Sequence, residues 1–211
     1  MCRWMRWDGT GRERPFLDHE CHRIYFLRQY ISRGGYKKSD TNQLILNFKK
    51  KPNVNEAQLH YKNKAITTFS IELRSIISKL KVKTALTWIP SSKAKDDPEY
   101  DDRLYRVADI ACRGLKRVNP IEFFSLEESV TSLHDGGIRN PETISGKWKY
   151  CCPDTINFSA ICIIDDVLTT GASMRAAMDK IRLHICDLPI IGIVWALAID
   201  DPNPFEDAAD I

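Results

Sequence analysis

Apolar residues change their spacing along the chain near Thr84, from a helical repeat to short continuous runs. Before Thr84 they recur every three or four positions, which predicts three helices. The first would be capped by Asp18 and run to residue 31, the second would be capped by Ser39 and end near Phe48, and the third would span residues 56–80. The first third of the chain is therefore predicted to be helical.

After Thr84, four apolar runs alternate with helical patterns. Such runs are typical of strands buried on both faces, and their alternation with helices predicts an α/β fold with a doubly wound parallel sheet. The predicted strands are residues 84–89, 121–126, 158–164 and 190–198, with helices over residues 100–117 and 170–185. Residues 1–56 would then be an N-terminal helical extension, and residues 57–211 an α/β domain.

The amino-acid composition limits which classes of protein this chain can belong to. The chain has 211 residues, of which 43% are hydrophobic, so a sizeable core can form. No apolar run is long enough for a membrane span, and residues 1–14 lack the apolar segment of a secretory signal, so we expect a soluble cytoplasmic protein. A net charge of +3 is too small to indicate nucleic acid by itself. The seven cysteines form no CxxC pair, which favours free thiols over a zinc site.

The strongest chemical pattern is the run from Ile161 to Ser173, ICIIDDVLTTGAS. A predicted buried strand ends in two adjacent carboxylates, a hydroxyl-rich loop follows, and a helix begins. Free N–H groups at the start of a helix bind anions, and carboxylates accept hydrogen bonds from neighbouring sugar hydroxyls. The run would thus hold a sugar phosphate at both ends. The alternative is an ordinary strand–turn–helix junction in which Asp and Ser act as caps.

This run resembles the phosphoribosyl pyrophosphate (PRPP) signature of type I phosphoribosyltransferases. The resemblance implies the fold of that family, and it implies that Asp165 and Asp166 are the catalytic pair that holds the ribose hydroxyls and Mg²⁺. It also implies a loop that wraps the 5-phosphate, formed by Thr169, Thr170, Gly171, Ala172 and Ser173.

Members of this family contact pyrophosphate through a loop after the first core strand, where this chain has Ser91, Ser92 and Lys93. Hydroxyls and a lysine suit a pyrophosphate, although a polar surface turn has the same composition. Family members also close a mobile flap over PRPP. Residues 127–150 occupy that slot, with Arg139 and Lys147 as candidate pyrophosphate contacts and a solvated variable loop as the alternative.

Within the family, the proline at the end of the first strand and the Arg-bearing flap are most similar to the ComF-type branch of competence proteins. Those proteins often begin with a cysteine zinc module, whereas only Cys2 and Cys21 lie in the first hundred residues here. The acceptor is selected by a variable hood in this family. Few residues follow the last predicted strand, so the hood would come from the helices of residues 18–56.

The resemblance implies an enzyme that uses PRPP and Mg²⁺ and transfers the phosphoribosyl group to an unidentified nucleobase or amine; a homodimer is left open. The alternative is a regulator that senses PRPP or a nucleotide, or a stress or defence module, on the same fold without turnover. Basic residues would then face nucleic acid or a partner, although a charge run is more often a solvated face. These residues are Lys37, Lys38, Lys49, Lys50 and Lys51.

Overall fold

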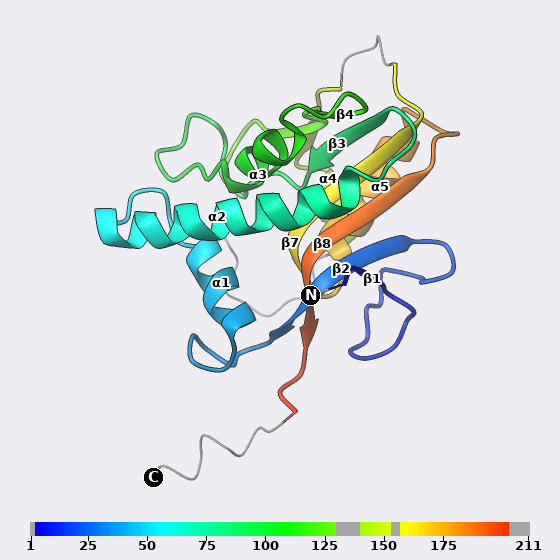
Figure 1. Ribbon diagram of the computed structural model, residues 1–211. Coiled ribbons are helices and arrows are strands. Elements are labelled where there is room, and N and C mark those ends of the chain that lie inside the picture. The colour runs from blue at the N-terminus through cyan, green and yellow to red at the C-terminus, as the bar shows by residue number, and fades with distance from the viewer. Residues whose placement is uncertain (1–2, 130–139, 153–156, 203–211) are drawn as a thin grey trace.

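A computed structural model describes residues 3–129, 140–152 and 157–202 of the chain (Figure 1). They form an α/β fold around a mixed, mostly parallel sheet of six strands, in the order β1-β2-β8-β7-β3-β4. Only the short β1 is antiparallel to its neighbour. The six strands are β1 (Met5–Arg6), β2 (Arg23–Ile31), β3 (Thr84–Trp88), β4 (Val118–Pro120), β7 (Ala160–Leu168) and β8 (Ile190–Ile199).

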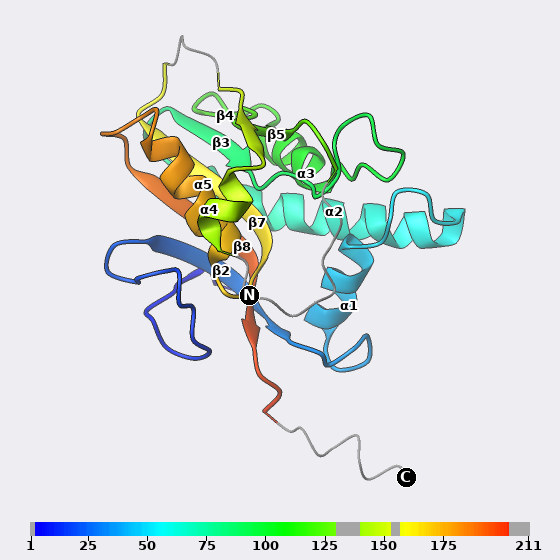
Figure 2. The same ribbon diagram turned by 180° about the vertical axis from the view of Figure 1, so that it is seen from behind.

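Helices cover both faces of this sheet. One face carries α1 (Asp40–Phe48), α2 (Glu56–Ile77) and α3 (Arg103–Cys112), and the other carries α4 (Pro141–Ser145) and α5 (Ala172–Arg182), as Figures 1 and 2 show from opposite sides. None of the helices in the described part of the chain is long and apolar enough to cross a membrane. The predicted helices over 100–117 and 170–185 are present but shorter at both ends.

Three predicted strands form the centre of the sheet. β3 is buried along its whole length, and β7 and β8 are buried at nearly every position, as their apolar runs predict. β7 lies between β3 and β8 and is parallel to both, in a register that pairs Leu86 with Cys162 and Cys162 with Ile191. The prediction of parallel strands near residues 84–89, 158–164 and 190–198 is confirmed.

The core on the α1–α2 side is built around Trp195 of β8. Its ring stacks on Phe69 of α2 at 4.7 Å between centroids and meets Phe48 of α1 edge-on at 5.5 Å. The indole N–H donates to Glu72 of α2 at 2.5 Å, and Glu72 also pairs with Arg28 of β2. This buried cluster ties α1 and α2 to the sheet and fixes where α1 ends.

The predicted helix over residues 18–31 is wrong, because Arg23–Ile31 forms β2. Ile24, Leu27 and Ile31 have the spacing of one helical face, which led to the helix prediction. The segment also carries Tyr25 and Phe26, which suit a pleated surface. Eight of its residues pair in parallel with β8. Tertiary pairing with an apolar neighbour strand thus overrides a weak helical pattern, and Asp18 caps no helix.

The predicted core strand over residues 121–126 is also wrong. The strand that pairs with β3 is β4, just before it, whereas β5 (Phe124–Leu126) pairs antiparallel with β6 (Trp148–Tyr150) in a separate two-stranded sheet. Phe124 packs against Trp148 with ring centroids 5.2 Å apart. Aromatic contacts between distant segments therefore decide this pairing, and the expected loop over residues 127–150 contains both α4 and β6.

Candidate functional site

A cavity of about 720 Å³ lies at the carboxyl ends of β3 and β7. Its walls come from four places: the end of α1, the loop after β3, the start of α3, and β7 with the first turn of α5. After β4 the chain crosses back over β3 to form β7, so the direction of strand order reverses between β3 and β7. Open α/β sheets bind ligands at such a switch point.

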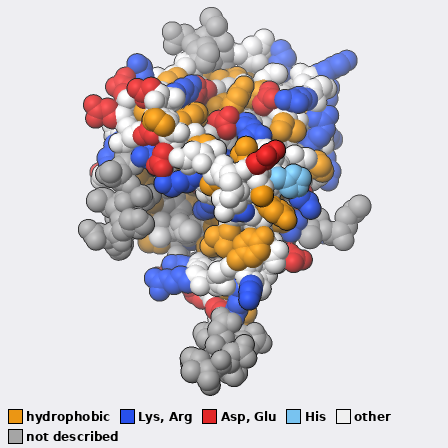
Figure 3. All heavy atoms as spheres, turned by 90° about the vertical axis from the view of Figure 1, so that its left-hand side faces the viewer, with side chains coloured by type: hydrophobic (Ala, Val, Ile, Leu, Met, Phe, Trp, Pro, Cys, Tyr) orange, Lys and Arg blue, Asp and Glu red, His pale blue; other side chains and the backbone are white. Residues whose placement is uncertain are grey.

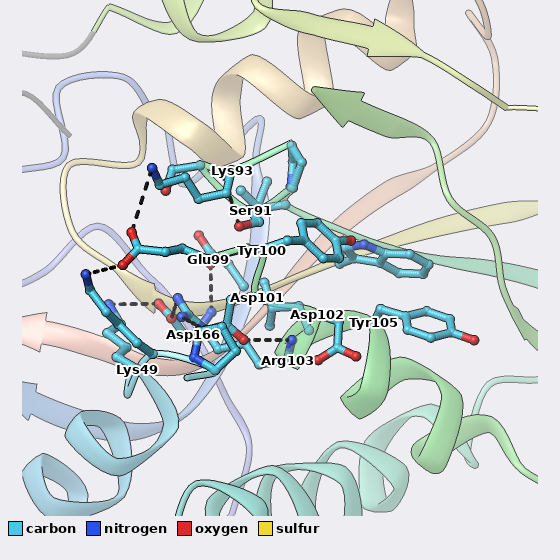
Figure 4. A pocket seen from close by; sticks show the side chains of 18 of the residues that line it. Lys49, Ser91, Lys93, Glu99, Tyr100, Asp101, Asp102, Arg103, Tyr105 and Asp166 are labelled. Atoms are coloured by element: carbon cyan, nitrogen blue, oxygen red, sulfur yellow. Dashed lines mark hydrogen bonds and ion pairs between the residues drawn. The ribbon is translucent and has the colours of Figure 1, made fainter. Parts of the chain in front are cut away.

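The structure brings several of the predicted site residues to this cavity. Ser91, Ser92 and Lys93 line it from the loop after β3, opposite residues from β7 and α5. Figure 4 shows Ser91 and Lys93 above the Asp166 carboxylate. The residues on the β7 and α5 side are Asp165, Asp166 and Ser173.

Asp165 and Asp166 lie inside β7 rather than after it. The strand was predicted to end at residue 164, but it continues to Leu168, which pairs with Leu197 of β8. Successive side chains in a strand point to opposite faces, so the two carboxylates leave the strand in different directions. The Asp165 carboxylate accepts a hydrogen bond from the backbone N–H of Asp166 at 2.8 Å.

The Asp166 carboxylate is held between two cations. Lys49 Nζ lies 3.1 Å from one oxygen, and the guanidinium of Arg103 lies 3.0 Å from the other (Figure 4). Burial alone would raise the pKa of Asp166, but the two positive charges outweigh burial and hold that pKa below its ordinary value. The Asp166 side chain is therefore held in its ionised form.

Asp165 has the opposite electrostatic setting. Burial and then the negative charge of Asp166 raise the pKa of Asp165 to about 7, and the more weakly acting cations Lys49 and Arg103 do not offset this. An added cation would favour the charged form of Asp165. Oxygen ligands suit Mg²⁺, which proteins usually bind through one or two carboxylates and substrate phosphates. The pair therefore fits a Mg²⁺ that is bound to a phosphorylated ligand. No group of three or more metal-ligating side chains occurs in the described residues.

The predicted phosphate loop is only partly open to this cavity. Ser173 lines it, but residues 169–172 are not among its lining residues. Gly171 is buried in the left-handed conformation at the start of α5, with φ 84°, and Thr170 Oγ1 accepts from the N–H of Ala172 at 3.4 Å. Leu17 packs against Gly171 so closely that a Cβ there would lie 2.5 Å from Leu17 Cδ1. The N-terminal segment therefore covers one side of the loop.

Two other predicted contacts are not placed in the cavity. Arg139 lies outside the described residues. Lys147 is exposed between α4 and β6 and is not among the lining residues. Gly146, just before Lys147, is the C-cap of α4 with φ −61°, a conformation open to any residue.

Sequence reasoning missed the cationic side of the site, formed by Lys49 and Arg103. Neither residue belongs to a motif, and both reach Asp166 only through tertiary packing of α1 and α3. One signal was present in the chain. Lys62 lies on the apolar stripe of α2 with Ile66, Phe69 and Leu73, where a charged side chain must find buried partners.

We predict that Gly171→Ala destabilises the protein more than Gly114→Ala. Both glycines have positive φ, 84° and 73°, so both substitutions introduce backbone strain of about 1–2 kcal/mol. A Cβ at Gly114 meets nothing within 4 Å, whereas one at Gly171 collides with Leu17. Leu17→Ala should therefore recover part of the loss in G171A. Urea unfolding of the three variants measures this, and equal losses for G171A and G114A would contradict the contact with Leu17.

Neither a scan against protein-family models nor a search of curated proteins finds a match to this chain. The residues of the cavity and their geometry are therefore the basis for inferring what the protein does.

Proposed function

We propose that this protein binds PRPP with Mg²⁺ and transfers the phosphoribosyl group to a nitrogen nucleophile, as a type I phosphoribosyltransferase. One observation carries the proposal. The adjacent carboxylates of β7 and the Ser91–Lys93 loop after β3 face one cavity at the switch point of the sheet, and a hydroxyl-rich loop leads from β7 into α5. The carboxylates, the loop after β3 and Ser173, which the sequence pattern predicts separately, thus line one cavity.

In this proposal the ligand spans the carboxyl ends of β3 and β7. The ribose hydroxyls donate to Asp165 and Asp166, and the 5-phosphate binds at the start of α5, where backbone N–H groups are free. Ser91, Ser92 and Lys93 contact the pyrophosphate. Asp165 and Asp166 would hold a Mg²⁺ ion, which would supply positive charge to that leaving group.

The transfer itself needs little covalent chemistry from the protein. The nucleophilic nitrogen forms a bond to the anomeric carbon while the bond from that carbon to the pyrophosphate oxygen breaks. The carbon passes through an oxocarbenium-like state, and Asp165 and Asp166 orient the ribose beneath it. Positioning and charge neutralisation therefore supply most of the rate acceleration. Trp88, Tyr100 and Tyr105 line the same cavity, where a planar acceptor would find aromatic surface.

One observation favours the second candidate, a PRPP or nucleotide sensor without turnover. Lys49 and Arg103 already offset the charge of Asp166. A carboxylate that is neutralised in this way gives less stabilisation to a developing positive charge on the sugar. Such a site can still hold ribose hydroxyls, because a carboxylate has more acceptor positions than two cations use.

The lysines that a nucleic-acid partner would need are mostly engaged within the chain. Lys38 pairs with Asp201 at 2.9 Å, Lys49 with Asp166, and Lys51 with Glu99 at 2.5 Å. On the face that Figure 3 shows, basic side chains are interspersed with acidic and apolar ones. These pairings favour a small phosphorylated ligand over a polynucleotide.

Pyrophosphate release from PRPP and Mg²⁺, measured against a panel of nucleobases and amines, decides between the two candidates. We expect release with one acceptor class and none without acceptor. Binding of PRPP without release from any acceptor would support the sensor instead. If the folded protein neither binds PRPP nor releases pyrophosphate from it, both the transferase and the sensor are refuted.

A further inference from the structure

Lys62 is a fully buried lysine in the first half of α2, only 1% exposed. Its ammonium has three hydrogen-bond donors and meets three acceptors. The carbonyl of Phe48 is 3.2 Å away, one carboxylate oxygen of Asp101 is 2.7 Å away, and the third acceptor is the carbonyl of Lys50. Burial lowers the pKa of Lys62, against hydrogen bonding and charge pairing with Asp101. Such a group is retained in a core only when its partners satisfy it.

The partners of Lys62 lead to Asp166 by two routes. Phe48 and Lys50 flank Lys49, so their carbonyls fix the end of α1 from which Lys49 extends. Asp101 also accepts from Arg103 at 2.7 Å. Lys49 and Arg103 then meet on opposite oxygens of Asp166. The contacts form a closed ring through α1, α2, α3 and β7, and Figure 4 shows its cavity side.

Lys49 is the charged member of this ring that is most exposed. Its side chain is 41% exposed and lines the cavity. Asp166 takes one of its three donors at 3.1 Å. The next two lysines are placed differently: Lys50 lies over the ring of Tyr61 at 5.3 Å, whereas Lys51 also lines the cavity but is paired there with Glu99. The ring therefore holds the Lys49 ammonium in the cavity, beside Asp166.

We infer that Lys49 binds a phosphate oxygen of the ligand and that Lys62 is the residue that positions it. This inference rests on the proposed function and extends it, because it adds a cation from α1, outside the strand–loop–helix pattern and the loop after β3. The ligand oxygen becomes a further acceptor for the Lys49 ammonium, and no covalent step is involved. Lys62 acts through the end of α1 and does not touch the ligand.

The test is calorimetric titration with two probes, Mg²⁺–pyrophosphate and Mg²⁺–PRPP. Lys49→Met should weaken both by about tenfold or more, since a charge-assisted hydrogen bond is lost. Lys64→Met removes one charge from an exposed position on α2 and serves as the matched control, with expected changes below about twofold. Equal affinities of K49M and wild type for both probes would overturn the inference while leaving PRPP binding intact.

A double-mutant cycle of Lys49 and Lys62 tests whether Lys62 positions Lys49. K62M should weaken pyrophosphate binding, and K49M/K62M should bind no more weakly than K49M alone, because Lys62 acts through Lys49. Additive losses in the cycle would overturn the positioning role. If K62M does not fold, Lys62→Gln, which keeps a donor for one carbonyl, replaces it in the cycle.

The two probes separate this inference from the proposed function. Wild-type binding of pyrophosphate but not of PRPP, with loss in K49M, would support the anion role of Lys49 and refute the ribose site. Binding of neither probe to the folded wild type would refute both.

Discussion

Replacing Asp165 and Asp166 together by Asn is expected to weaken Mg²⁺–PRPP binding by a hundredfold or more, on the order of 3 kcal/mol. The change keeps size and shape but removes two negative charges that would face the ribose hydroxyls and Mg²⁺. Hydrogen bonds to a charged acceptor are stronger than those to a neutral one, by roughly a factor of two. Titration calorimetry with PRPP and Mg²⁺ on the wild type and the double variant measures the loss.

Variants on α5 and in the loop before it serve as comparisons for the double change. Asp179→Asn removes a carboxylate from α5 that pairs with Arg175 on the surface, so it should leave the affinity unchanged. Thr170→Ala or Ser173→Ala should weaken binding less than the double change, because backbone N–H groups at the start of α5 would still hold the phosphate. Equal affinity of the wild type and D165N/D166N would remove the basis for a PRPP site at these carboxylates.

The centre of the fold could be predicted from the sequence because its signals are local. β3, β7 and β8 are mostly apolar and mostly buried, and such runs are typical of strands covered on both faces. Ser39 caps α1 as predicted, since its hydroxyl accepts from the N–H of Asn42 at 3.0 Å. Each of these features depends on residues within a few positions of one another.

The edges of the sheet could not be predicted in the same way. β2 is a strand because β8 offers it an apolar partner, and β5 leaves the main sheet because Phe124 packs against Trp148. Both outcomes depend on contacts between segments far apart in the chain. A helical count of apolar positions registers neither contact, so it assigned a helix to residues 18–31 and a core strand to residues 121–126.

The candidate site likewise contains some residues that the local sequence pattern predicts and others that only tertiary packing brings to the cavity. Asp165, Asp166, Ser173 and the loop from Ser91 to Lys93 reach the cavity because strand ends bring them there. The partners of Asp166 come from α1 and α3, whose approach depends on the packing of Phe48 and Trp195 and on the buried Lys62. The local pattern thus predicts the acidic side of the cavity, and tertiary packing adds the cationic side.

The two adjacent carboxylates are expected to have opposite effects on stability. Asp166→Asn leaves Lys49 and Arg103 without their shared counter-charge. Removing one partner of a buried ion pair typically costs 3–5 kcal/mol. Because the Lys49 side chain is 41% exposed and remains hydrated, we expect a smaller loss, on the order of 2–3 kcal/mol at pH 8. Asp165→Asn should instead raise stability at pH 8, because it removes a charge that burial and Asp166 disfavour.

The pH dependence of D165N distinguishes this cause from a change in packing. The pKa of Asp165 rises from an ordinary 3.8 to about 7 on folding, so the folded state favours the protonated form. That contribution to stability is fully present below pH 3.8 and is lost as the pH rises through 7. The gain in D165N should therefore be large at pH 8, on the order of 2 kcal/mol, and small near pH 4.

Asp166 has a lowered pKa, so its contribution to stability is present at neutral pH and is lost only as the pH falls through the folded-state pKa. Urea unfolding of both single variants at pH 8 and pH 4.5 measures the two effects. A D165N variant that is less stable than the wild type at pH 8, or a D166N variant that matches the wild type there, would show that Lys49 and Arg103 do not hold the site as we argue.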